Sequence, residues 1–333
     1  MNIEQWNPST LLQLSGSYWQ TCALHAAVKL DIFSALSQGP LSNDVLSKNV
    51  HADPRSMAML LNTITAMGLL QKQNDQYNNT PASQQFLSKH SEQYIGYMIL
   101  HHHHLMESWA KLPKAVVSGK SVRERPVHQE NEVLESFLMG MFNNAMLIAP
   151  KVAEHIDLST SKNLLDLGGG PGTYAIFFCK KNSHLNATVF DLPTTMPFAM
   201  KTIERFQLQD RIQFVPGNYE QDEIHGTYDA VWISHILHAE GPEQCDLLIH
   251  KAVSALKSNG LIFIHEFILN DDMASPLFPT LFSLNMLLGT ANGQAYSEFQ
   301  IKAMLQKQGV KEIKRLDFKG PNDSGIIMGK VLR

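Results

Sequence analysis

The fold of this chain is decided at residues 164–172, LLDLGGGPG, where a short apolar run ends in four glycines and a proline. Such a run is typical of a buried strand, and glycines let the backbone turn sharply and approach a ligand. A helix is expected to begin at Thr173. A strand, a glycine turn and a helix together form the first unit of an open α/β sheet, which binds ligands at the carboxyl ends of its strands.

The spacing of these glycines excludes two phosphate-binding motifs. The dinucleotide fingerprint requires G-x-G-x-x-G, but Thr173 occupies the third position, and no GK[ST] follows as in a P-loop. A glycine turn with the acidic start Asp166 suits an amino-acid tail and a nucleoside better than a pyrophosphate. Asp191 ends the next strand, where a carboxylate can accept hydrogen bonds from both ribose hydroxyls. We predict nucleoside binding; the alternative is that Asp191 only caps the following helix.

Further apolar runs alternate with helical segments after this turn. The runs at 187–192, 212–217, 228–235 and 260–269 are continuously apolar, as in a parallel sheet covered on both faces. Two further runs, VKEIKRLDF at 310–318 and GIIMGKVL at 325–332, are joined by KGPNDSG, which is too short for a crossover helix, so these two runs should pair antiparallel. The prediction is an α/β fold, with a Rossmann-like doubly wound sheet over residues 161–333 that contains one antiparallel strand.

The segment before this domain is expected to be mainly helical. We predict helices over residues 11–38, 92–120 and 129–157. Between them, Ser42 is a candidate N-cap, Pro54 can open a helix that Gly68 ends, and QKQNDQYNNTP at 71–81 resembles a hairpin. Two helices and a hairpin form a winged-helix pattern. We therefore expect a winged-helix domain over 1–95 and a helical linker over 96–160.

Composition excludes several classes of protein. The 333 residues are 44% apolar and 17% charged, with a net charge of -4, which argues against disorder and against nucleic acid as the partner. The wing segment is itself almost neutral. Cys22, Cys179 and Cys245 are far apart and show no CxxC spacing, which suits a reducing cytoplasm. No apolar run approaches the ~18 residues of a membrane span, and we find no export signal.

Four consecutive histidines at 101–104 invite a metal hypothesis. Four consecutive helical residues point in different directions, so at most two of them share a face. We therefore expect no metal site in this chain.

An ordered set of motifs carries a family resemblance. DLGGGPG at 166–172, FDLP at 190–193, VPGNY at 215–219, and ILH at 236–238 followed by HEFIL at 265–269 resemble the class I S-adenosylmethionine-dependent O-methyltransferases. The most similar subgroup contains plant caffeate, animal hydroxyindole and bacterial polyketide or phenazine enzymes. The resemblance implies a homodimer formed through the N-terminal domain, with the linker contributing to the dimer and the active site. It also implies methyl transfer to the hydroxyl of a small aromatic or polyketide-like molecule, without a metal.

The resemblance also assigns roles by position. His238 would be the general base and Glu266 the carboxylate that orients it. A phenol has a pKa of ~10, so a base of pKa ~6.5 helps to form the phenolate at neutral pH. His235 and His265, also near strand ends, remain alternatives for this role. The residues implied for the cofactor are Gly168, Gly170, Asp191, Leu192, Asn218, Tyr219 and Ser234, and those implied for the acceptor are Phe142, Met146, Asn285 and Met286.

Two positions depart from the family pattern. Ala239-Glu240 follows the histidine where the family usually has Asp-Trp, and Ala295 stands where it often has a second glutamate. These departures keep C-methylation, N-methylation or another use of the cofactor open as alternatives. A ligand-sensing, DNA-binding regulator is a further alternative, which the near-neutral wing disfavours.

Overall fold

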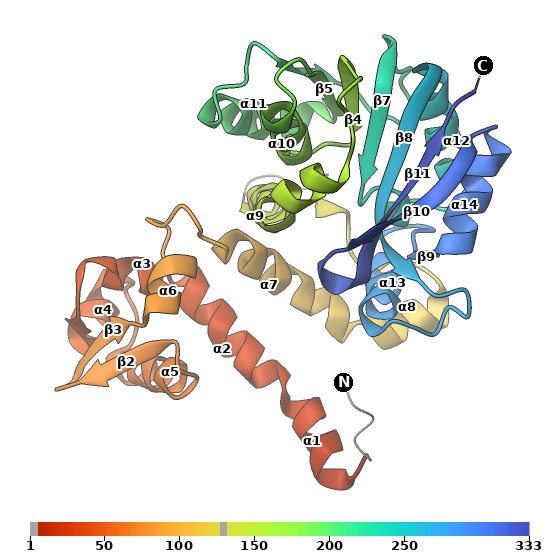
Figure 1. Cartoon of the computed structure of the whole chain (residues 1–333). Coiled ribbons are helices and arrows are strands. Elements are labelled where there is room, and N and C mark those ends of the chain that lie inside the picture. Colours follow the sequence, from red (N-terminus) through yellow and green to blue (C-terminus); the bar gives the residue numbers. More distant parts are fainter. Residues whose placement is uncertain (1–5, 127–131, 333) are drawn as a thin grey trace. The chain divides into compact units, whose positions relative to one another are not determined.

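A computed structural model of the chain describes residues 6–126 and 132–332, and every structural statement below concerns these residues. The chain divides into two compact units, Met1–His104 and Leu105–Arg333 (Figure 1). The boundary lies inside one helix, α7 (Gly96–Ala110). The division into three parts that the sequence predicts, at 95 and 160, stays a prediction.

The first unit begins with a series of short helices. The prediction of one helix over 11–38 is wrong, because Asp31 has a left-handed φ of 57° that a continuous helix cannot contain. Asn7 caps the first of these helices through a capping box with Thr10. The observed segments are α1 (Pro8–Gly16), α2 (Tyr18–Lys29), α3 (Ile32–Ala35) and η1 (Leu36–Gln38).

The helix–helix–hairpin order predicted for this unit is observed. Ser42 Oγ accepts from Val45 N, Pro54 opens the second helix, and Gly68 follows its end at φ +76°. The short strand β1 pairs with β3, which also pairs with β2, both antiparallel. The elements are β1 (Leu41–Ser42), α4 (Asn43–Asn49), α5 (Pro54–Ala66), β2 (Leu70–Gln73), β3 (Gln76–Asn79) and α6 (Pro81–Phe86).

The helix predicted over 92–120 is interrupted, so that prediction is also wrong. It forms α7 and α8 (Leu112–Ser118), separated at Lys111. Pro113 explains the break, because its ring clashes with the carbonyl four residues earlier in a continuous helix.

The next helix, α9 (Glu132–His155), agrees with the prediction of 129–157 except that it ends two residues earlier; 129–131 lie outside the described residues. One window of α9 has a mean hydropathy of 1.2, so by length and composition alone this helix could cross a membrane. This corrects the expectation that no apolar stretch is long enough. A buried core helix passes the same test, and α9 buries Phe142, Ala149 and Val152.

A single sheet organises the second unit. Its order is β10-β11-β8-β7-β4-β5-β6, and β11 is the reversed strand, antiparallel to both of its neighbours. The other neighbouring strands pair parallel, and β9 (Tyr296–Ser297) pairs with the end of β8. The strands are β4 (Asn163–Leu167), β5 (Asn186–Asp191), β6 (Ile212–Pro216), β7 (Tyr228–Ser234), β8 (Leu256–Leu269), β10 (Lys311–Lys319) and β11 (Ser324–Lys330).

Helices cover both faces of this sheet (Figure 1). Successive residues of β7 point to opposite faces of the sheet. Trp232 belongs to the hydrophobic cluster that contains residues of α9, α10 and α11, whereas Val231 belongs to the cluster that contains residues of α12 and α14. The strand order reverses at β4, which lies between β5 and β7, and ligands bind at such switch points. The remaining elements are α10 (Thr173–Lys181), η3 (Pro193–Thr195), α11 (Met196–Arg205), η4 (Leu237–Ala239), α12 (Pro242–Ser254), α13 (Leu277–Gly289), α14 (Glu298–Lys307) and η5 (Pro321–Asp323).

Candidate active site

The glycine turn lies at the switch point, directly after β4. Gly168, Gly170 and Gly172 have φ values of +67°, +56° and +78°, which favour glycine. Space is equally restrictive, because a Cβ on Gly168 would lie 2.5 Å from Ile236 Cδ1 and one on Gly169 would lie 2.6 Å from Asp166 Cγ. Glycine is therefore required at these positions, because the backbone of the turn passes close to the side chains of Ile236 and Asp166.

Asp191 holds this turn in place. Its Oδ2 accepts from Gly170 N at 2.7 Å, and its Oδ1 accepts from Leu192 N at 2.6 Å and from Thr195 Oγ1 at 3.2 Å. Burial raises the pKa of Asp191, and the two backbone N–H groups oppose that shift. The structure thus brings Gly170, Asp191 and Leu192 together. The alternative that Asp191 caps the following helix is wrong, because the N-cap of η3 is Leu192 and no side chain caps either η3 or α11.

Asp166 lies directly against the same turn. It is buried, and its Oδ2 accepts from Ala175 N at 3.2 Å. Burial raises the pKa of Asp166 to about 7. The sequence indicated it only as the acidic start of the motif, although its buried carboxyl group is part of the site's framework.

The segment after β6 lies beside Asp191, because Gly217 N donates to Asp191 O at 2.9 Å. Asn218 Oδ1 accepts from Glu220 N at 2.9 Å, so this oxygen stabilises a local turn. Tyr219 is partly buried and its hydroxyl donates to Glu240 Oε1 at 3.0 Å. Both predicted cofactor residues therefore lie in a segment that contacts the end of β5.

Ser234 ends β7 and is bonded to a buried histidine. Its Oγ lies 3.0 Å from His265 Nδ1. His265 is fully buried, and burial holds its pKa well below the usual range. Its ring packs against Trp232 and Tyr174. This environment is that of a neutral structural histidine rather than a base that meets a substrate.

The strongest polar contact at the carboxyl edge joins His238 and Glu266. His238 Nδ1 lies 2.8 Å from Glu266 Oε2, and the His238 backbone N donates to Glu266 Oε1 at 3.3 Å. Burial alone would raise the pKa of Glu266, but the imidazoles of His238 and His235 hold it well below its usual range. An ionised carboxylate on Nδ1 favours the tautomer in which Nε2 is free to accept a proton.

His235 shares the same carboxylate. Its Nδ1 lies 3.6 Å from Glu266 Oε2, its φ is 56°, and its ring lies 4.3 Å from that of Phe267. His235, His238 and Glu266 therefore present possible ligand atoms within 4.8 Å of one another. The sequence predicted no metal here, and it placed His235 only among alternative bases.

The predicted acceptor residues lie on two helices. Phe142 and Met146 are one turn apart on α9, and Phe142 is buried. On α13, Asn285 and the buried Met286 follow Phe282, whose ring contacts His238 at 4.7 Å. A pocket shared by the two helices stays a prediction.

Ala295, where the resemblance implied a second glutamate, is fully buried, and its backbone N donates to Ser283 Oγ at 3.0 Å. Position 295 supplies no carboxylate, and the carboxylate that bonds His238 is that of Glu266.

The sequence analysis did not indicate two arginines that bond residues at or beside the candidate site. Arg123 Nη2 donates to Asn285 Oδ1 at 3.0 Å and to Asn285 O at 3.2 Å, and burial lowers the pKa of Arg123 to about 10. Arg125 binds Glu240. Both lie in SVRERP, where polar composition gave no sign of partners more than a hundred residues away.

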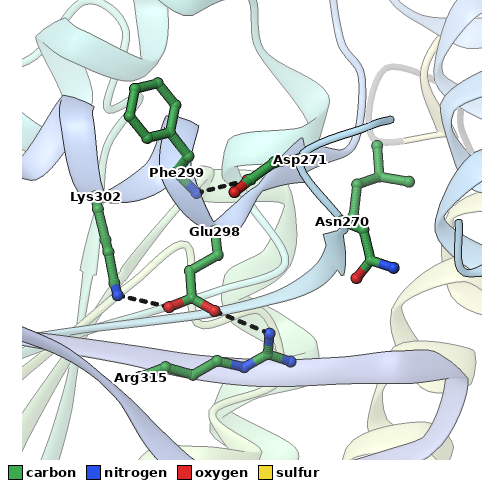
Figure 2. Close-up of a pocket in the computed structure, with 7 residues that line it drawn as sticks. Asn270, Asp271, Glu298, Phe299, Lys302 and Arg315 are labelled. Atoms are coloured by element: carbon green, nitrogen blue, oxygen red, sulfur yellow. Dashed lines mark hydrogen bonds and ion pairs between the residues drawn. The ribbon is translucent and has the colours of Figure 1, made fainter. Parts of the chain in front are cut away.

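A shallow pocket lies elsewhere in this unit (Figure 2). In it, Glu298 pairs with Lys302 at 2.6 Å and with Arg315 at 3.1 Å. Its cations are already neutralised, and no predicted site residue lines it. The lining residues are Leu269, Asn270, Asp271, Glu298, Phe299, Lys302 and Arg315.

Comparison with known proteins agrees with this geometry. A model of the O-methyltransferase domain matches residues 114–311, and one of the O-methyltransferase dimerisation domain matches residues 12–89. The chain is 29% identical over 328 residues to a 3-hydroxy-5-methyl-1-naphthoate 3-O-methyltransferase of Streptomyces sahachiroi, covering 97% of this chain and 95% of the relative. It is 29% identical over 326 residues to the tetracenomycin polyketide synthesis 8-O-methyl transferase of Streptomyces glaucescens, covering 96% of each.

Solved structures show the same fold. An O-methyltransferase family protein from Burkholderia thailandensis matches with a TM-score of 0.88 at 24% identity over 99% of both chains. Human N-acetylserotonin methyltransferase, solved with S-adenosylmethionine, matches with a TM-score of 0.85 at 22% identity over all of both chains. The catalytic-domain model covers more than half of the chain. The chain therefore belongs to the O-methyltransferase family and is an S-adenosylmethionine-dependent methyltransferase.

Proposed function

We propose that this enzyme methylates a hydroxyl group of a small aromatic or polyketide-like acceptor, with His238 as general base. The observation that carries the proposal is the 2.8 Å contact between His238 Nδ1 and Glu266 Oε2 at the carboxyl edge of the sheet. The names of the two Streptomyces relatives support an aromatic acceptor.

The glycine turn fits S-adenosylmethionine, since the space beside Gly170 is open, with nothing within 4 Å of a Cβ placed there, and the carboxylate of Asp191 lies against the same residue. In the proposed complex Gly168 and Gly170 approach the methionine part, and Asp191 and Leu192 hold the ribose. Asn218 bonds the adenine amino group and Tyr219 covers the ring. Ser234 lies near the methionine tail.

The chain's own residues then handle the proton. The bound cofactor supplies an electrophilic methyl group. His238 Nε2 accepts the proton of the acceptor hydroxyl as the new O–C bond forms and the S–C bond breaks. Glu266 keeps a proton on Nδ1 and stabilises the imidazolium. Phe142, Met146, Asn285 and Met286 orient the acceptor so that its oxygen is aligned with the leaving sulfur.

The test is a reaction of the purified full-length chain with S-adenosylmethionine and matched acceptors. Hydroxynaphthoates and simple phenols are compared with aryl amines of the same skeleton, which report N-methylation. Mass spectrometry should show O-methylated products together with S-adenosylhomocysteine. A protein that forms no methylated product and gives no calorimetric heat with S-adenosylmethionine would contradict the proposal.

We further propose that the enzyme works as a homodimer in the cytoplasm. Helices α1 and α2 expose large apolar side chains, of which Leu12 is 73% and Trp19 70% exposed. Such an exposed apolar patch, on a chain that matches a dimerisation domain, supports a dimer interface on these helices.

We expect the double substitution Leu12→Asp and Trp19→Asp to raise the dimer dissociation constant at least tenfold, because burying one such side chain contributes roughly 1.5–3 kcal/mol. Light scattering at several concentrations measures it. Phe299→Asp, at an exposed apolar residue of the second unit, is the matched control and should leave the mass unchanged. A wild-type chain that is monomeric, or a double variant that dimerises normally, would contradict this assignment.

A further inference from the structure

Arg125 and Glu240 form an ion pair beside η4. Arg125 Nη1 donates to Glu240 Oε1 at 2.8 Å, and Nη2 donates to Glu240 Oε2 at 3.3 Å, so the contact is bidentate. The Glu240 side chain is only 5% exposed and that of Arg125 is 25% exposed. Bidentate arginine–carboxylate pairs fix orientation as well as charge, which a lysine cannot reproduce.

The same arginine holds the backbone of the base segment. Arg125 Nη2 donates to the carbonyl oxygen of Ala239 at 2.7 Å, next to His238. The helix that carries His238 is a single 3-10 turn, Leu237–Ala239. Such short turns have weak internal hydrogen bonds, so their orientation depends on contacts from outside.

Glu240 also connects this segment to the predicted adenine site. Its Oε1 accepts from the Tyr219 hydroxyl at 3.0 Å, while its backbone O accepts from the Tyr296 hydroxyl at 2.6 Å. The Tyr219 backbone is fixed in turn, because Lys251 Nζ donates to its carbonyl oxygen at 3.0 Å. One buried carboxylate therefore joins Tyr219, Arg125 and the turn that carries His238.

We propose that Arg125 and Glu240 are positioning residues that couple cofactor binding at Tyr219 to the placement of the base His238. The inference rests on the proposed function. An adenine ring bound against Tyr219 would restrain the Tyr219 hydroxyl and, through it, the Glu240 carboxylate. Glu240 and Arg125 together then hold η4 in place. This proposal gives a role to the Ala239-Glu240 pair, which stands where the family usually has Asp-Trp: the Glu240 carboxylate bonds both Tyr219 and Arg125.

The test compares Arg125→Gln, Glu240→Gln, the double variant and Tyr219→Phe, which keeps the ring but loses the hydroxyl. The pair Arg315 and Glu298, at 3.1 Å and more exposed, provides the control variant Arg315→Gln.

We expect Arg125→Gln to lower kcat roughly tenfold and to weaken S-adenosylhomocysteine binding by about three- to tenfold, because it leaves a buried carboxylate partly unpaired. The KM for the acceptor should change less than kcat, because the substitution displaces the base rather than the acceptor site. Arg315→Gln should match the wild type.

The double variant separates coupling from simple damage. If the two residues act as one unit, it should be no worse than the more severe single variant in kcat, and the melting temperatures measured without ligand should be non-additive. Additive effects, or wild-type kcat and affinity in Arg125→Gln, would overturn the proposal. If Arg125→Gln fails to fold, Arg125→Lys and Tyr219→Phe carry the same measurements. A wild type that binds no S-adenosylhomocysteine would instead refute the proposed function, while the ligand-free melting data would still decide whether Arg125 and Glu240 act as one unit.

Discussion

Replacement of His238 by alanine is expected to lower kcat for methyl transfer by ~10²-fold or more, the scale of general base catalysis. In the proposed mechanism the imidazole accepts the proton of the acceptor hydroxyl at Nε2, and Glu266 holds the ring through the 2.8 Å contact at Nδ1, so alanine removes both the proton acceptor and its orientation. Affinity for S-adenosylhomocysteine should stay within about threefold, because the base acts on the acceptor and not on the nucleoside. Product formation under saturating substrate and calorimetry on the same preparation measure the two effects.

The pH dependence of this variant gives a second check. A phenol with a pKa of ~10 ionises unaided as the pH rises, so activity of His238→Ala should increase steadily towards alkaline pH. Glu266→Gln should reduce kcat by a smaller factor, since the imidazole remains but loses its ionised partner. His235→Ala is the neighbouring histidine control and should retain most of the turnover. Unchanged turnover in His238→Ala would remove His238 from the role of base.

Substitution of Asp191 by alanine is expected to weaken cofactor binding by ~1.5–3 kcal/mol, the scale of hydrogen bonds to a charged group. That is about 10- to 150-fold in the dissociation constant. Asp191 accepts from Gly170 N at 2.7 Å, so alanine both releases the turn and deletes the proposed ribose acceptor. Titration calorimetry with S-adenosylhomocysteine measures the change.

Two matched variants divide these contributions. Asp191→Asn keeps the shape and one acceptor oxygen, and should bind more tightly than the alanine variant. Thr195→Val deletes only the 3.2 Å contact from Thr195 Oγ1 and should leave cofactor affinity unchanged. Equal affinity in wild type and Asp191→Ala would show that Asp191 serves only to bond the turn and the start of η3.

Local signals in the sequence predicted most of the second unit's architecture. The continuous apolar runs gave the parallel strands, and the short KGPNDSG link gave the reversed strand. The same signals failed where helices break. Hydrophobic spacing runs through Asp31 and Lys111, but the left-handed backbone at Asp31 and the proline that follows Lys111 end the helices there. Periodicity reports which residues face the core, and it does not report where a helix stops.

Only part of the candidate site could be predicted from the sequence. His238 follows β7 and Glu266 lies near the end of the neighbouring parallel strand β8, so a resemblance that orders the strands also predicts their proximity. Arg125 could not be found in this way, because its partner Glu240 lies in a distant segment and both are charged residues that would ordinarily face solvent. A glutamate at a position expected to hold tryptophan was the available signal that a buried cation must be nearby.

The close approach of Gly168 to Ile236 limits how this enzyme could acquire new acceptors. Ile236 Cδ1 would lie 2.5 Å from any Cβ at position 168, and Ile236 is two residues before His238. Any side chain at position 168 would therefore have to displace that of Ile236, which lies in the segment that carries the proposed base. In the proposed complex the acceptor meets α9 and α13, so we expect changes of substrate range to fall on side chains of these helices other than Phe282, whose ring packs against that of His238. Libraries aimed at bulkier phenols should be built on these two helices.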